Sequence, residues 1–113
     1  MKRILNLIIL CVFVVSAHAK DFRFALFTDL HITHSTTAAE DLQKAVNQVN
    51  ATPGLDFVIV SGDVTEEGDR ASLEKAKSIL DKLNVKYYIT SGNHETKWSE
   101  SGCTDFSEVF GSD

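Results

Sequence analysis

Residues 57–63 read Phe-Val-Ile-Val-Ser-Gly-Asp (FVIVSGD), and this stretch decides the fold that the sequence predicts. Its first four residues are apolar and include β-branched side chains, which favour a strand. An apolar run without polar alternation is typical of a strand in a parallel sheet that is covered on both faces. We therefore expect residues 57–61 to form a central parallel strand that opens into a loop at Gly62-Asp63.

Two similar segments flank this strand along the chain. Residues 22–28 (FRFALFT) are rich in aromatic and apolar side chains and run into the polar segment Asp29-Leu30-His31. Residues 85–90 (VKYYIT) run into Ser91-Gly92-Asn93-His94-Glu95. Short apolar segments that end in polar loops predict two more strands.

Helical patterns fill the two intervals between these strands. Thr37-Ala38-Ala39-Glu40 matches a capping box, and apolar residues recur behind it at helical spacing until Asn50. A second helix is expected to begin at Asp69 or Ser72 and to carry an apolar face as far as Leu83. Because short helical crossovers join parallel strands, the sequence predicts an α/β fold in the order βαβαβ.

The three polar loops bring residue types that bind metals to one edge of the predicted sheet. In chain order these residues are Asp29, His31, Asp63, Asn93 and His94. Open α/β sheets bind their ligands at the carboxyl ends of the strands, where all three loops lie. Carboxylate, amide and imidazole donors together suit Mn, Fe or Zn ions, and the two oxygens of Asp63 can bridge two ions.

Each of these short patterns has a plainer explanation when it stands alone. Gly62-Asp63 and Gly92-Asn93 are ordinary turn dipeptides, and an Asp-x-His triplet is common by chance. Turns do not require the two histidines as well, so the combination favours a metal site. Glu66 stays open between an acid that supports the ligands and an acid of a solvated loop.

Composition limits the classes of function. The chain has 113 residues, of which 43% are hydrophobic and 24% are charged, and this size suits one small domain. The formal net charge of −5 argues against the broad basic surface of a nucleic-acid-binding protein, so no nucleic acid is expected as a partner. Phosphate chemistry on so acidic a chain would therefore depend on metal ions.

The first 19 residues predict a secretory signal peptide. A basic pair, Lys2-Arg3, precedes an apolar run over residues 7–15, and Ala17-His18-Ala19 gives the small-residue ending that favours cleavage. The run is shorter than the roughly 20 residues of a membrane-spanning helix. We expect residues 1–19 to be removed and residues 20–113 to be exported to the periplasm or the extracellular space, with no stable membrane span.

Three motifs follow one another in a distinctive order: Asp29-Leu30-His31, Gly62-Asp63-Val64-Thr65-Glu66 and Gly92-Asn93-His94-Glu95. With them the chain resembles the calcineurin-like metallophosphoesterase superfamily. The resemblance implies a four-layer αββα sandwich, of which this chain holds the first βαβαβ half. Residues 20–113 would then be the N-terminal portion of the phosphoesterase domain, because the histidine ligands that the family carries further downstream have no counterpart after His94.

The resemblance also implies a centre of two divalent or trivalent metal ions, Mn, Fe or Zn. By position, Asp29 and His31 would bind the first ion. Asp63 would bridge both ions, and Asn93 would bind the second. Two such ions would lower the pKa of a shared water and clamp the oxygens of a phosphate group.

The implied reaction is the hydrolysis of a small phosphate mono- or diester by the metal-activated hydroxide. His94 would contact the substrate phosphate or protonate the leaving group. Glu66 occupies the place of an acid, elsewhere in the family an Asp, that orients this histidine. Phosphoprotein phosphatases usually carry an arginine where Glu67 stands, so that branch is not expected. The fragment itself is expected to be inactive. The alternative to an enzyme is a noncatalytic interaction module, or an inactive fragment, on the same fold. Neither the substrate nor the oligomeric state follows from the sequence.

Overall fold

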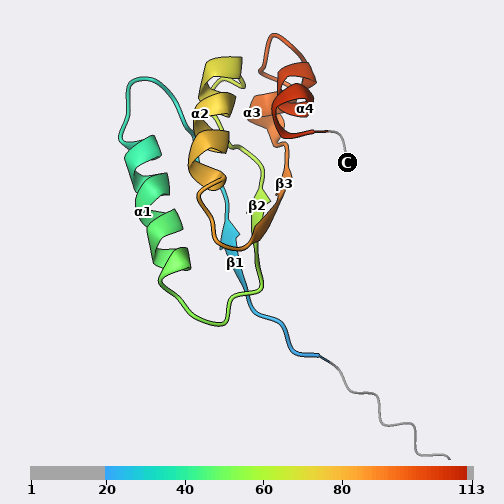
Figure 1. The fold of residues 1–113 in the computed structure, drawn as a ribbon. Coiled ribbons are helices and arrows are strands. Elements are labelled where there is room, and N and C mark those ends of the chain that lie inside the picture. The colour runs from blue at the N-terminus through green and yellow to red at the C-terminus, as the bar shows by residue number, and fades with distance from the viewer. Residues whose placement is uncertain (1–19, 112–113) are drawn as a thin grey trace, which may run out of the picture.

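The computed structural model describes residues 20–111 (Figure 1). These residues form a parallel sheet in the strand order β1-β2-β3, with β1 at Phe24–Phe27, β2 at Phe57–Ser61 and β3 at Lys86–Thr90. The helices are α1 (Ala38–Asn50), α2 (Arg70–Leu80), α3 (Asn93–Thr96) and α4 (Thr104–Phe110), and none of them has the length and apolar character to cross a bilayer. The predicted α/β fold and its βαβαβ order are confirmed. The predicted signal peptide lies outside the described residues.

β2 is the central strand, and its bounds are those predicted from its apolar run. It pairs in parallel with β1 from Phe24 opposite Phe57, and with β3 as far as Thr90 opposite Ser61. β1 is shorter than the predicted segment 22–28, because its pairing starts only where β2 itself starts. Since all three strands run in one direction, the loops that follow them leave the sheet at the same edge (Figure 1).

The hydrophobic core lies between one face of the sheet and the helices α1 and α2 (Figure 1). Val58 and Val60 of β2 point to this side and are completely buried. Burial of each such side chain contributes about 1.5–3 kcal/mol to folding. The buried apolar residues of the core are Ile32, Leu42, Val46, Val49, Val58, Val60, Val64, Leu73, Ala76, Ile79, Leu80 and Phe106.

The opposite face of the sheet is open in the part of the chain that the structure describes. Phe24, Leu26 and Tyr88 lie on it and are 45%, 57% and 52% exposed. The ring of Phe24 stacks on Phe57 with 5.4 Å between centroids, so the aromatic side chains cover one another only in part. Among residues 20–111 β2 is covered on one face only, which is what the first βαβαβ half of the implied sandwich would leave, because the second sheet is not among these residues.

α1 begins without the predicted capping box. Thr37 precedes the helix with φ −78° and ψ 2°, and its side chain makes no capping hydrogen bond. Its hydroxyl instead donates to the Asp41 carboxylate at 3.3 Å. The capping box fails because this backbone conformation is not the extended one that aims an N-cap oxygen at the free N–H groups of the first turn.

α2 begins at Arg70, and Asp69 before it has an extended backbone and accepts the backbone N–H of Ser72 at 3.0 Å. Asp69 is therefore the cap, and Ser72 lies inside the helix. Burial opposes ionisation of Asp69, but the hydrogen bonds from Ser72 and the nearby His34 together hold its pKa below the ordinary value. The helix ends at Leu80, earlier than predicted, and Leu83 packs against the core from beyond its end.

Replacing Asp69 by alanine should lower the free energy of unfolding at pH 7 by about 1 kcal/mol, because the N–H of Ser72 loses its acceptor. Asp69→Asn keeps an acceptor and should lose less. Because folding lowers the pKa of Asp69, the stabilisation by its charge is present above the ordinary value of 3.8 and is lost as the pH falls through the folded-state pKa. Urea denaturation at several pH values measures both effects. Equal stability of the wild type, Asp69→Ala and Asp69→Asn at pH 7 would contradict the role of Asp69 as the helix cap.

Candidate metal centre

Three side chains with ligand atoms come together where β1 and β2 end. Asp29, His31 and Asp63 each offer one such atom, and these atoms lie within 4.8 Å of one another. His31 Nε2 is 3.7 Å from Asp29 Oδ1. The two loops are also joined through their backbones, since the N–H of Asp29 donates to the Gly62 carbonyl at 3.3 Å and that of His31 to the Asp63 carbonyl at 3.1 Å. The structure thus brings together three of the residues that the sequence analysis singled out.

The backbone of all three residues is strained. Their φ angles are 53° at Asp29, 48° at His31 and 47° at Asp63. This left-handed region costs residues with a β-carbon about 1–2 kcal/mol each. Asp and His adopt it more readily than most side chains, and such strain gathers at functional sites, where the surrounding structure maintains it. The strained backbone at all three residues therefore favours a functional role for this cluster.

Two glycines allow the loops to approach one another. Gly62 has a φ of 87°, and a β-carbon on it would press against the backbone of Gly92. Gly92 has no such φ restriction, but a β-carbon there would overlap the carboxylate and the amide of Asp63. Gly62 thus supplies both a positive φ and a close backbone approach, and Gly92 supplies a close approach to Asp63.

His94 lies at the start of α3 and is buried, with 7% of its surface exposed. Its backbone N–H donates to Asp63 Oδ1 at 3.2 Å, which ties the third loop to the cluster. Its Nδ1 lies 2.5 Å from the carbonyl oxygen of Glu66. A carbonyl can only accept, so the proton is assigned to Nδ1 and Nε2 is left free. The ring meets His31 and Trp98 edge to face, at 4.8 Å and 4.2 Å between centroids.

Glu66 lies differently from what the family resemblance implies. Its carboxylate was expected to orient His94, but Oε2 lies 2.8 Å from Nδ1 of His31. The contact with His94 is made by the main-chain carbonyl of Glu66 instead. The reason is that the N–H of Glu66 donates to the carbonyl of Ile32 at 3.1 Å, which ties this residue to the first loop.

The donors in the cluster fit a divalent cation. Two carboxylates and an imidazole with no thiolate among them suit Mn²⁺, Fe²⁺ or Zn²⁺. Asn93, which was predicted to bind a second ion, is the exposed first residue of α3. The backbone N–H of its neighbour His94 donates to Asp63 Oδ1, so the loop that carries Asn93 is tied to the carboxylate that was predicted to bridge. The second ion and its ligands stay a prediction.

Glu95 is a structural member of the site that the sequence analysis missed. It is 1% exposed, and its Oε1 accepts the backbone N–H of Thr65 at 2.8 Å and the Thr65 hydroxyl at 3.1 Å. Its Oε2 accepts the N–H of Gly92 at 2.8 Å. One buried carboxylate thus fastens the loop after β2 to the loop after β3. The signal was present in the sequence, because Gly92 and Glu95 have the spacing of a capping box.

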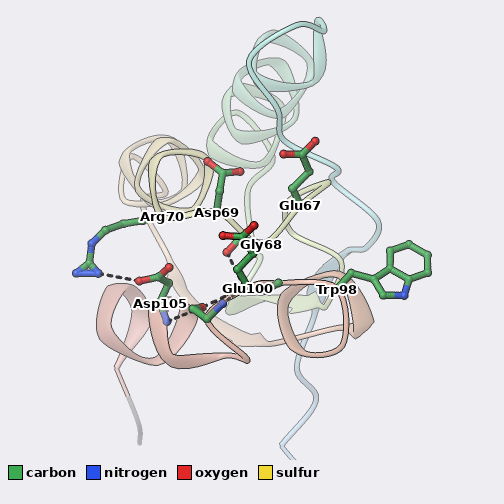
Figure 2. A pocket seen from close by; sticks show the side chains of 9 residues that line it. Glu67, Gly68, Asp69, Arg70, Trp98, Glu100 and Asp105 are labelled. Carbon is green, nitrogen blue, oxygen red and sulfur yellow. Dashed lines mark hydrogen bonds and ion pairs between the residues drawn. The ribbon is translucent and has the colours of Figure 1, made fainter.

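A pocket of about 470 Å³ lies between the residues that precede α2 and the segment that joins α3 to α4 (Figure 2). Its charged and aromatic lining residues are Glu67, Asp69, Arg70, Trp98, Glu100 and Asp105. Arg70 is paired with Asp105 at 3.3 Å, and Figure 2 shows the indole of Trp98 pointing away from the carboxylates. None of the predicted ligands lines this pocket, so it is distinct from the candidate metal centre.

Comparison with known proteins gives two findings. The family model of calcineurin-like phosphoesterases matches residues 22–112. A protein of Rhodopseudomonas palustris (strain ATCC BAA-98 / CGA009), named as a probable cyclic nucleotide phosphodiesterase, is 29% identical over 82 residues. That match covers 66% of this chain and 30% of the relative, so the chain spans less than a third of the relative's length.

Proposed function

Because this chain belongs to the calcineurin-like phosphoesterase family, we propose that the protein hydrolyses phosphate esters with bound divalent metal ions. The observation that carries the proposal is the cluster of Asp29, His31 and Asp63, whose ligand atoms lie within 4.8 Å of one another. All three residues have a strained backbone, which is difficult to explain without a function for the loops. The family match alone would support only the general class of hydrolase.

The metal ions would lower the pKa of a water molecule and offset the negative charge of the phosphate. The residues of the chain prepare the site for this chemistry. The Asp63 carboxylate accepts the backbone N–H of His94, and this hydrogen bond holds the His94 residue close to the carboxylate. The main-chain carbonyl of Glu66 accepts a hydrogen bond from Nδ1 of His94. Nε2 is then the atom that would face the substrate, and it would contact a phosphate oxygen or pass a proton to the leaving group only from an imidazole protonated on both nitrogens.

For the substrate we propose a small phosphate mono- or diester. The Rhodopseudomonas relative is named as a probable cyclic nucleotide phosphodiesterase, which favours a diester. We also propose, from the sequence of residues 1–19, that the protein is exported. N-terminal sequencing of the protein recovered from its native cells would find Lys20 first, and a chain that still begins at Met1 would contradict export by this route.

The proposed activity is tested by assaying the purified full-length protein on an aryl phosphate and a bis-aryl phosphodiester, with and without Mn²⁺. We expect turnover that depends on the metal and is lost in Asp63→Ala. Asp21→Ala is the matched control, because it removes the same charge from an exposed residue ahead of β1. No metal-dependent turnover above that of Asp63→Ala would overturn the proposal and leave the noncatalytic alternative.

A further inference from the structure

The carboxylate of Glu66 and the imidazole of His31 form a contact that neither the family resemblance nor the proposed reaction accounts for. Oε2 lies 2.8 Å from Nδ1, and on the other side of the ring Nε2 lies 3.7 Å from Asp29 Oδ1. We propose that Glu66 is a positioning residue for His31: it holds the proton on Nδ1 and turns Nε2 toward Asp29 and Asp63. This inference rests on the proposed function, because it concerns how the chain prepares a metal ligand.

The chemistry of the two groups fixes the tautomer. An ionised carboxylate can only accept, so a close approach to Nδ1 places the imidazole proton there. A neutral histidine has one such proton, and Nε2 is therefore left with the lone pair that a cation needs. Nδ1 is buried and has no aligned hydrogen bond among residues 20–111. The Glu66 carboxylate, with Oε2 2.8 Å from Nδ1, is the acceptor within reach.

The backbone places Glu66 for this task. Ile32 and Thr65 form an isolated parallel bridge, and the N–H of Glu66 donates to the Ile32 carbonyl at 3.1 Å. Residue 66 is thereby held beside the first loop, one position away from the bridge. Its main-chain carbonyl reaches Nδ1 of His94 on the way. One residue thus contacts both imidazoles, but only the contact with His31 depends on its side chain.

Because the Glu66 side chain contacts His31 and its main chain contacts His94, a side-chain substitution tests the proposal without unfolding the protein. The Glu66 side chain is 50% exposed, and exposed pairs of this kind contribute little to the free energy of unfolding. Glu66→Met removes the acceptor at similar length, and Glu66→Gln keeps a neutral acceptor. Glu67→Met removes the same charge from the neighbouring exposed residue and is the matched control.

Two measurements on the purified protein separate positioning from a general loss of charge. Nitrogen-15 NMR of the metal-free protein reports the tautomer of each histidine, and calorimetric titration with Mn²⁺ reports affinity. Glu66→Met should abolish the predominance of the Nδ1–H tautomer at His31 and weaken Mn²⁺ binding about 10- to 100-fold, the usual effect of losing such a partner. Glu66→Gln should restore part of both. His94 should keep its tautomer in every variant, because its partner is a main-chain carbonyl.

Glu67→Met should match the wild type in both measurements. Wild-type affinity in Glu66→Met, or an unchanged His31 tautomer, would overturn the positioning role. Asp63→Ala in the same titration separates the two proposals. If it loses Mn²⁺ binding while Glu66→Met does not, only the positioning inference fails. If Asp63→Ala binds like the wild type, the metal centre itself is wrong and the inference fails with it.

Discussion

Replacing Glu95 by alanine should lower the free energy of unfolding by about 3 kcal/mol or more. The substitution leaves the buried N–H of Thr65 and the partly buried N–H of Gly92 without their acceptor, and an unsatisfied buried group costs about 1–3 kcal/mol. The Thr65 hydroxyl loses a partner as well. Because folded proteins are stable by only about 5–15 kcal/mol, this is a large share of the total. Urea denaturation followed by circular dichroism measures it.

Two further variants show whether the effect comes from this carboxylate. Glu100→Ala removes the same charge from an exposed position and should change stability by less than about 0.5 kcal/mol. Glu95→Gln has the right size but sets an NH₂ group against one of the N–H donors, so it should lose a substantial part of the stability. If Glu95→Ala is as stable as Glu100→Ala, the buried link between the two loops is not what holds them.

The second large effect is expected from Gly92→Ala. Its β-carbon would overlap the Asp63 carboxylate, so either that side chain or the third loop must move. Overpacking of this kind costs about 1–3 kcal/mol of stability. Because the displaced group is the central ligand, we also expect at least a tenfold loss of Mn²⁺ affinity, which corresponds to about 1.4 kcal/mol. Calorimetric titration with Mn²⁺ checks the second expectation directly.

Gly102→Ala separates the steric effect from the conformational one. Gly102 has a φ of 56°, but a β-carbon on it would meet no atom within 4 Å. Its substitution should therefore cost about 1–2 kcal/mol through backbone strain alone and leave Mn²⁺ affinity unchanged. Equal Mn²⁺ affinity in Gly92→Ala and Gly102→Ala would contradict the close approach of Gly92 to Asp63.

The sequence predicts those parts of the fold that depend on one-dimensional patterns. The apolar run of β2 is bounded where it was expected, because a continuous β-branched segment has few alternatives. The convergence of Asp29, His31 and Asp63 follows from the parallel order of β1 and β2, which short helical crossovers impose. Such topological constraints need no knowledge of side-chain directions.

The parts that were missed depend on how the loops meet in space. The direction of the Glu66 side chain is set by the bridge between Ile32 and Thr65, and spacing along the chain does not record that bridge. The spacing of Glu95 from Gly92 indicates only their local hydrogen bond, whereas the two hydrogen bonds from Thr65 depend on how the loops after β2 and β3 meet. At Thr37 the sequence predicted a capping box that does not form, because the local motif did not determine the backbone conformation.

The most direct test of the metal centre is anomalous diffraction from crystals of the protein grown with Mn²⁺ and measured at the manganese absorption edge. We predict an anomalous peak within coordination distance of Asp29, His31 and Asp63, with Nε2 of His31 as its imidazole ligand and no corresponding peak in Asp63→Ala. A well-ordered site without a peak, or a peak bound by other residues only, would contradict the assignment of these loops as a metal centre.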